Sequence, residues 1–243
     1  SVEIADAVPG NVGFIVDIPI GNITAYIKAS RSHLDSRSRL DKYESVLQSQ
    51  KKEMGENAEE WAKSLDIKEI AINLPLGEKM RQLLLLRPGV RQSAGKISAM
   101  SCAGFARTVF GEVFTSEDES TCALVGKWIA IGAAECVEKY SETDFLQETL
   151  SVRLKSEGLD RVPQKNCAAW MYHSLSEDPN LLDANFTPMM AKGLRNILKG
   201  AAYVPVTLSV VSDGGLMTLN FNLDRIEVSK GTVALSSAKD TTV

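Results

Sequence analysis

VGFIVDIPIGNITAYIKA, residues 12–29, is the stretch on which the expected fold depends. Runs rich in β-branched and aromatic residues flank Gly21 and Asn22, two residue types that accept the positive φ angles of short hairpin loops. The pattern therefore predicts a β-hairpin over residues 12–29. Pro19 has no amide hydrogen to donate, so we expect its end of the first strand to lie at a sheet edge or beside the turn.

A second β-hairpin is predicted near the other end of the chain, over residues 203–228. Residues 204–211 and 216–228 alternate in polarity and contain many β-branched side chains. The segment between them, Ser212-Asp213-Gly214-Gly215, is a strong turn signal. The simplest arrangement pairs the two hairpins in one small antiparallel sheet.

The sequence between the hairpins, residues 32–200, predicts a mostly helical body. From Leu40 to Trp61, apolar residues recur at three-, four- and seven-residue steps, which is the spacing of one helix face, and Gly55 divides this stretch into two helices. Further along, a strand is expected over residues 69–74, and helices over 78–86, 92–114, 117–140, 144–157, 164–175 and 188–199.

These elements define an α+β fold: a mostly helical body with an N-terminal and a C-terminal β-hairpin that form a small antiparallel sheet. Residues 1–10 are expected to form an N-terminal arm, residues 11–230 a single domain and residues 231–243 a C-terminal tail. No repeat or low-complexity linker divides the chain.

Composition and charge restrict the classes of function. The chain of 243 residues and 26.4 kDa has 44% hydrophobic and 24% charged residues, as globular proteins do. This excludes a disordered chain, a collagen-like repeat and a disulfide-rich miniprotein. A net charge of -4 and a pI of 5.4 give no overall attraction for nucleic acid or anionic lipid. Any site for a polyanion must therefore be local.

Cysteine usage and hydropathy indicate a cytoplasmic protein with no membrane insertion. The longest nearly uncharged apolar run, residues 129–134, is too short to span a bilayer, and residues 1–10 lack the basic-then-apolar order of a signal peptide. The cysteines form no CxxC pair and have no histidine at ligand spacing, so we interpret them as reduced, buried residues of apolar helices. They are Cys102, Cys122, Cys136 and Cys167.

Basic residues are segregated along the chain. Residues 79–111 contain six basic residues and no acidic one: Lys79, Arg81, Arg87, Arg91, Lys96 and Arg107. A smaller acid-free stretch holds Lys192, Arg195 and Lys199. If the two stretches converge, they form a positive groove for the nucleic-acid backbone, since the planar guanidinium matches phosphate oxygens. The alternative is that these residues are solvated faces and helix-end cations.

Catalytic signals are scarce in this sequence. Only two histidines occur: His33 lies in a polar segment, and His173 lies in an apolar one. No nucleophile elbow, zinc-protease motif, phosphate loop or dinucleotide fingerprint is present. We therefore predict no enzyme, catalytic residue, cofactor or metal. An enzyme with a site assembled around His173 is kept as a third hypothesis.

Two weaker signals concern binding. Tyr26, Tyr43 and Tyr203 lie on or beside predicted surface elements and are candidates for stacking on bases. The chain ends in Thr241-Thr242-Val243, which matches the short ending that PDZ domains capture as an added strand. The alternative for this ending is a frayed polar terminus.

The leading hypothesis is a non-enzymatic, self-associating structural protein that binds nucleic-acid backbone, RNA or single-stranded DNA, as a nucleocapsid or packaging protein does. Its terminal segments are expected to lie on neighbouring subunits of a homo-oligomer. The alternative is an adaptor or regulatory module that binds protein partners through sheet edges or the helices of residues 32–65, without nucleic acid.

Overall fold

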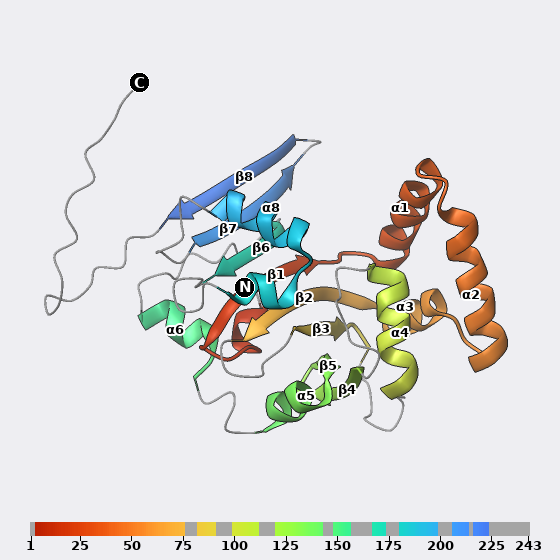
Figure 1. Cartoon of the computed structure of the whole chain (residues 1–243), viewed down its shortest axis with the longest axis horizontal. Coiled ribbons are helices and arrows are strands. Elements are labelled where there is room, and N and C mark those ends of the chain that lie inside the picture. The colour runs from red at the N-terminus through yellow and green to blue at the C-terminus, as the bar shows by residue number, and fades with distance from the viewer. Residues whose placement is uncertain are drawn as a thin grey trace, which may run out of the picture.

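One antiparallel sheet of eight strands runs through the part of the chain that the structure describes (Figure 1). The structure is a computed structural model that describes residues 3–75, 82–90, 99–111, 120–142, 148–156, 167–173, 180–198, 206–213 and 216–223. The strand order is β4-β5-β3-β2-β1-β6-β7-β8. The strands are β1 (Val12–Pro19), β2 (Ile67–Pro75), β3 (Leu83–Pro88), β4 (Ser120–Val125), β5 (Trp128–Ala133), β6 (Cys167–His173), β7 (Val206–Asp213) and β8 (Leu216–Leu223).

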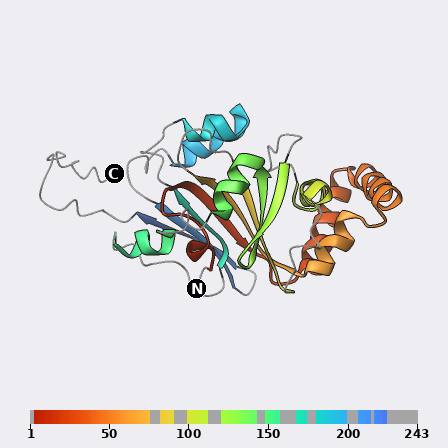
Figure 2. The same cartoon turned by 90° about the horizontal axis from the view of Figure 1, so that it is seen from below.

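Helices cover both faces of this sheet, and four of them gather at one end of it (Figures 1 and 2). That group consists of α1 (Ile23–Ser36), α2 (Leu40–Met54), α3 (Ala58–Leu65) and α4 (Ala99–Phe110). The others described are the 3-10 helix η1 (Glu3–Asp6), α5 (Ala134–Ser141), α6 (Leu150–Ser156), α7 (Leu181–Asn185) and α8 (Pro188–Leu198). The α+β class expected from the sequence is therefore present, with a much larger sheet.

The predicted N-terminal hairpin is wrong, because its second half is a helix. Asn22 is the N-cap of α1: its side-chain oxygen accepts a hydrogen bond from the Ala25 amide at 3.0 Å. Ile23 and Ile27 are buried one helical turn apart. The same Gly-Asn pair that permits a hairpin turn thus also starts a helix. The neighbours of β1 are β2 and β6, so the sheet is not a pair of terminal hairpins.

The predicted helical body of residues 32–200 is interrupted by five strands. The expected helices at 78–86 and 164–175 are replaced by β3 and β6, and the one at 117–140 by β4, β5 and α5. The apolar run of β3 is buried on both faces of the sheet. The spacing of apolar residues in such a continuous run does not distinguish a strand from a helix. At the β4–β5 turn, Gly126 has a φ of +59°, which favours glycine.

Other sequence expectations agree with the structure. The helices α2, α3 and α8 and the strand β2 lie where they were expected, and α4 and α6 lie within the stretches 92–114 and 144–157. In the stretch expected to form the C-terminal hairpin, β7 and β8 are antiparallel neighbours, with Asp213 opposite Leu216. The tail, residues 231–243, lies outside the described residues.

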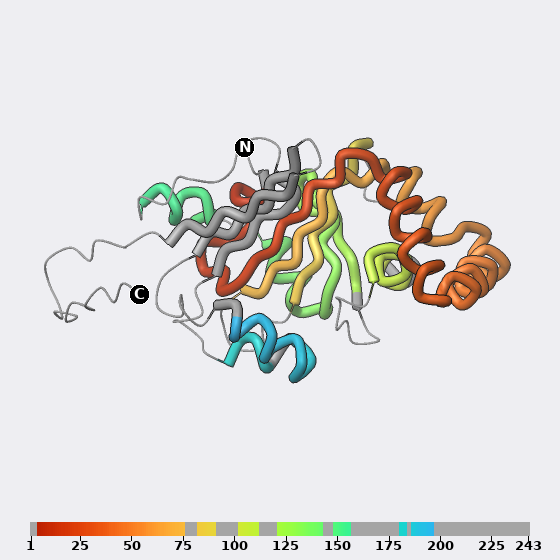
Figure 3. The backbone as a smooth tube through the Cα atoms, turned by 90° about the horizontal axis from the view of Figure 1, so that it is seen from above, coloured from red at the N-terminus to blue at the C-terminus, as the bar shows by residue number. Residues whose placement is uncertain are grey.

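Two layers of apolar side chains hold the helices on the sheet. On one face, η1, α5 and α6 pack against alternate residues of the central strands, such as Leu83 and Leu85. On the other face, α1 to α4 pack against Leu84 and Leu86, and α7 and α8 cover Phe14 and the neighbouring part of β2. Figure 3 shows α6 and α8 on opposite sides of the sheet. We call these the η1 face and the α1 face.

The expected N-terminal arm is built into the core. Ile4 and Val8 are fully buried on the η1 face. The Gly10 amide donates a hydrogen bond to the Glu148 carbonyl at 2.6 Å, and Arg153 donates one to the Gly10 carbonyl at 2.7 Å. Residues 3–10 are thus held within their own chain, and a contact of theirs with a neighbouring subunit stays a prediction.

Candidate functional site

A groove lined by cationic side chains lies between α2 and the end of α4. Its volume is about 360 Å³. Three of its lining residues are basic and none is acidic, although the protein as a whole carries a net charge of -4. We call it the basic groove; it is lined by Leu34, Arg39, Lys42, Tyr43, Val46, Arg107, Thr108 and Gly111.

The turn between α1 and α2 positions the first wall of the basic groove. The Arg39 amide donates a hydrogen bond back to the Leu34 carbonyl at 2.9 Å, which reverses the chain within a few residues. Arg39 is the N-cap residue of α2, and Lys42, Tyr43 and Val46 follow at helical spacing. Residues three and four apart share one helix face, so α2 presents all four along the same wall.

The second wall is the C-terminal half of α4, and hydrogen bonds join it to α2. The Gln50 side-chain amide donates to the Thr108 hydroxyl oxygen at 3.0 Å. Thr108 in turn donates to the Gly104 carbonyl at 2.9 Å, one turn earlier in α4. Arg107 precedes Thr108 and also lines the groove. The spacing of the two walls is therefore fixed by contacts outside the cationic residues.

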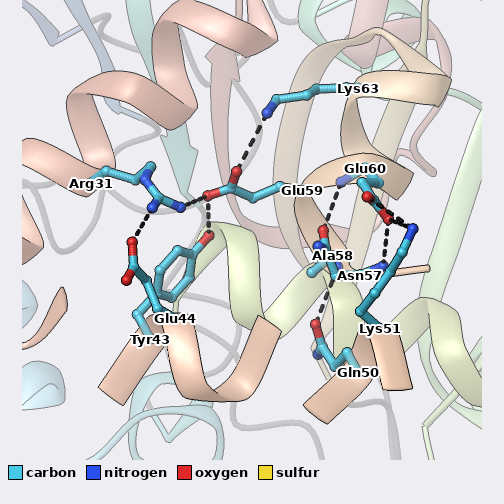
Figure 4. Close-up of polar contacts among 10 residues, drawn as sticks. All are labelled: Arg31, Tyr43, Glu44, Gln50, Lys51, Asn57, Ala58, Glu59, Glu60 and Lys63. Atoms are coloured by element: carbon cyan, nitrogen blue, oxygen red, sulfur yellow. Dashed lines mark hydrogen bonds and ion pairs between the residues drawn. The ribbon is translucent and has the colours of Figure 1, made fainter. Parts of the chain in front are cut away.

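A network centred on Glu59 holds Tyr43 in place (Figure 4). The Tyr43 hydroxyl donates to a Glu59 carboxylate oxygen at 3.2 Å, and Arg31 donates to the same oxygen at 2.8 Å. Lys63 reaches the other oxygen at 3.4 Å, and Arg31 also forms an ion pair with Glu44. The Arg31 guanidinium carbon lies 6.0 Å from the Tyr43 ring centroid. The Tyr43 ring is thus held at the groove by its hydroxyl contact with Glu59 and by the nearby Arg31 guanidinium.

The charge states in this network follow from burial and from these partners. Burial, and then the negative charge of Glu59, raise the pKa of Tyr43, so its phenol stays neutral. Burial alone would raise the pKa of Glu59, but the hydrogen bonds from Arg31 and Lys63 outweigh it and lower that pKa. Glu59 is therefore a carboxylate whose charge is neutralised by its own cations. It does not compete for Arg39 or Lys42, neither of which forms an ion pair with a described residue.

No protein-family model, curated protein or solved structure matches this chain. The kind of ligand that the basic groove could bind is therefore inferred from the side chains that line it. Guanidinium and ammonium groups around a half-buried aromatic ring suit an anion that carries a flat group, as a nucleotide does.

Among the predicted nucleic-acid-binding residues, the structure places only Arg107 in the basic groove. Arg87 lies on the η1 face of β3, where its Nε donates to the buried Glu69 at 2.6 Å. On α8, Arg195 forms an ion pair with Asp183, and Lys192 is exposed. Outside the described residues lie Lys79, Arg81, Arg91, Lys96 and Lys199.

The described members of the two basic stretches do not converge. Arg87 belongs to the η1 face, whereas α4 and α8 lie on the α1 face. On that face, α8 covers Phe14, while α4 packs against β4 and β5 at the end of the sheet where α1 to α3 gather (Figure 1). Arg107 is instead joined by Arg39 and Lys42, which the analysis of the sequence missed. Their stretch, RSHLDSRSRLDK (residues 31–42), also contains Asp35 and Asp41, so it is not an acid-free run.

The structure places some of the other histidine, tyrosine and cysteine residues that the sequence singled out. His33 is exposed near the end of α1, and Tyr26 packs on Phe110 with ring centroids 5.8 Å apart. Contrary to expectation, Cys122 and Cys167 lie in strands and not in helices. Tyr203 and residues 241–243 fall outside the described residues.

The described part of the chain holds no group of three or more His, Cys, Asp or Glu side chains that could bind a metal ion. No helix within it has the length and apolar character needed to cross a bilayer.

Proposed function

We propose that this protein is a non-enzymatic, self-associating protein that binds the backbone of single-stranded nucleic acid in the basic groove. The observation that carries the proposal is a groove with three cationic side chains, a fixed aromatic ring and no carboxylate in its lining. In an acidic protein, such a local arrangement attracts phosphates to the groove. Tyr43 supplies a stacking surface that every base can use, so binding is expected to be independent of sequence.

The size of the groove fits one nucleotide unit better than a long duplex. Its 360 Å³ lies at the small end of the range of roughly 300–1,000 Å³ for ligand sites. A single strand can place one phosphate between Arg39 and Lys42 and turn its base towards Tyr43. A duplex keeps its bases stacked inside and would offer only phosphates.

The experiment compares two variants with the same change in net charge. Arg39→Glu with Lys42→Glu reverses two charges in the groove, and Lys52→Glu with Lys139→Glu reverses two exposed charges away from its lining. Binding of a labelled oligouridine is followed by fluorescence anisotropy over a series of salt concentrations. The groove variant should bind at least about tenfold more weakly. The slope of its log affinity against log salt concentration should be shallower by about 0.7, the value for the one lost phosphate contact.

The control variant should bind within about twofold of the unaltered protein. If both variants lose the same affinity, net charge and not the groove determines binding, and the proposal is wrong. It is equally wrong if the unaltered protein does not bind the oligouridine at low salt.

For self-association we propose the edge strand β4 as the contact surface. Its sequence, STCALV, contains no charged residue and no proline, the usual protections of an exposed edge. The same feature favours the adaptor hypothesis, in which a partner strand pairs with β4. Light scattering on the eluting protein separates the two: an oligomer that Thr121→Lys converts to monomer supports self-association, and a monomer in both forms supports the adaptor.

A further inference from the structure

A second pocket in the helical group lies between α1 and α3 and has a volume of about 390 Å³. None of the residues that line it also lines the basic groove. We call it the mixed-charge pocket, because side chains of both charges line it together with hydroxyl and apolar groups. Its charged lining residues are Lys28, Arg31, Asp35, Glu59 and Lys63.

The inner wall of the mixed-charge pocket is a fixed network of ion pairs. Glu59 is only 8% exposed. Arg31 donates to one of its carboxylate oxygens at 2.8 Å, and Lys63 donates to the other at 3.4 Å (Figure 4). Arg31 also pairs with Glu44 of α2, so its guanidinium is held from two helices. This wall is therefore formed before any ligand arrives, which lowers the cost of binding.

Two opposite charges at the opening of the pocket are left unpaired. Lys28 and Asp35 are exposed, and neither forms an ion pair with a described residue. The residue four positions after Lys28 is Ser32, which carries no charge. The residue four positions before Asp35 is Arg31, whose guanidinium is already bound to Glu59. The described lining therefore offers an ammonium and a carboxylate to a ligand.

The spacing of Lys28 and Asp35 suits one small ligand that carries both charges. They are seven residues apart on α1, so they share one face of the helix with about 10.5 Å between them along its axis. Two charge-assisted hydrogen bonds of about 2.8 Å each leave roughly 5 Å for the ligand. An α-amino acid fits this length, because its ammonium and carboxylate groups are attached to the same carbon atom.

Apolar side chains in the same pocket favour an aliphatic ligand side chain. Ile27 of α1 and Leu40 of α2 both line the pocket. An aliphatic group placed against them is removed from water, which stabilises the complex. A ligand with two negative charges would instead bring one of them towards Asp35 and would be disfavoured.

We propose that the mixed-charge pocket binds a free α-amino acid with an aliphatic side chain. Lys28 binds the carboxylate of the amino acid, Asp35 binds its ammonium group, and Ile27 and Leu40 contact its side chain. This binding is independent of the proposed binding of nucleic acid, since the two sites have no lining residue in common.

The test titrates leucine into the unaltered full-length chain and follows the amide signals of the protein by NMR. Leucine should bind with a Kd of about 1 mM or tighter and should shift signals of α1. N-acetylleucine lacks the ammonium charge and leucinamide lacks the carboxylate, so each should bind at least about tenfold more weakly. These comparisons use the unaltered protein and do not depend on the folding of a variant.

Three results of this titration would overturn the proposal. The first is the absence of any shift at about 10 mM leucine. The second is equal affinity for leucine, N-acetylleucine and leucinamide. The third is displacement of leucine by an equal concentration of inorganic phosphate, which would show that the pocket is a site for anions in general.

Variants then test the assigned contacts. Asp35→Asn should weaken leucine binding at least about fivefold but should change the binding of N-acetylleucine by less than about twofold, because only leucine carries the ammonium group. Lys28→Met should likewise weaken the binding of leucine and not that of leucinamide. The controls Asp41→Asn and Lys52→Met, at exposed positions of α2 outside the lining, should bind leucine as the unaltered protein does. If Asp35→Asn weakens leucine and N-acetylleucine equally, Asp35 does not bind the ammonium group and the proposal is wrong.

Discussion

Asp17 makes the stability of this protein depend on pH in a direction opposite to that of an ordinary salt-bridged aspartate. It lies on β1, is 1% exposed and stands opposite Ala71 of β2. Burial, and then the negative charge of Glu69, raise its pKa from 3.8 to about 9, and the positive charge of Arg87 offsets part of this rise. The folded protein therefore holds a proton on Asp17 at neutral pH that the unfolded chain releases.

The sign and size of the effect follow from proton linkage. Below pH 3.8 both states are protonated and Asp17 has no net effect on unfolding. Between that pH and about pH 9, the folded state binds one more proton than the unfolded state, so stability falls as pH rises. A difference of one proton corresponds to about 1.4 kcal/mol per pH unit, so the loss from pH 5 to pH 8 is about 4 kcal/mol at most.

Asp17→Asn removes the ionisation while keeping the shape of the side chain. Unfolding in urea at several pH values between 5 and 8 gives the free energy of unfolding of each protein by linear extrapolation. The stability of Asp17→Asn relative to the unaltered protein should rise with pH, by up to about 1.4 kcal/mol per unit. Asp41→Asn, at an exposed position in α2, is the control variant for the change from Asp to Asn. If the stabilities of Asp17→Asn and the unaltered protein change in parallel with pH, the reasoning is refuted.

Three further predictions follow from local contacts. Asn57→Ala removes the side chain that accepts from the Glu60 amide at 3.0 Å and should lower the free energy of unfolding by about 1 kcal/mol, measured in urea. Leu85→Ala, at a fully buried position in β3, should lower it by about 2–5 kcal/mol, and a cost below 1 kcal/mol would contradict its place in the core. Tyr43→Ala should weaken oligouridine binding roughly fivefold or more, about 1 kcal/mol of stacking, while Tyr43→Phe retains the ring and should retain binding.

The sequence predicts best those elements whose pattern is local. The helices α2 and α3 were predicted because their apolar side chains recur on one face and Gly55 separates them. The strand β3 was not predicted, because Leu83 to Leu86 are buried on both faces of the sheet. Helices α1 to α4 cover one face, and η1, α5 and α6 cover the other. The sequence of β3 therefore shows no alternation of apolar and polar residues. At Asn22, one residue type serves both a turn and a helix cap, and only tertiary packing of Ile23 and Ile27 decides between them.

The candidate site was predicted only in part for a related reason. Arg107 was predicted as a binding residue because residues 79–111 contain no acidic residue. Arg39 and Lys42 have Asp35 and Asp41 as sequence neighbours, so no charge run marks them. They become a site through the packing of α2 on α4 and the neutralisation of Glu59 by Arg31 and Lys63, and neither contact is visible in the order of residues.

The strand order also sets the sequence in which the sheet can be completed during synthesis. The five strands on one side, β4-β5-β3-β2-β1, all come from residues 12–133, whereas β6, β7 and β8 come from residues 167–223. A five-stranded half-sheet therefore emerges from the ribosome before any of the last three strands does. Until β6 emerges, β1 is an outer strand with unpaired amides and carbonyls, the kind of edge that recruits other nascent chains. The time between the emergence of residue 133 and that of residue 173 thus determines how long that edge stays open.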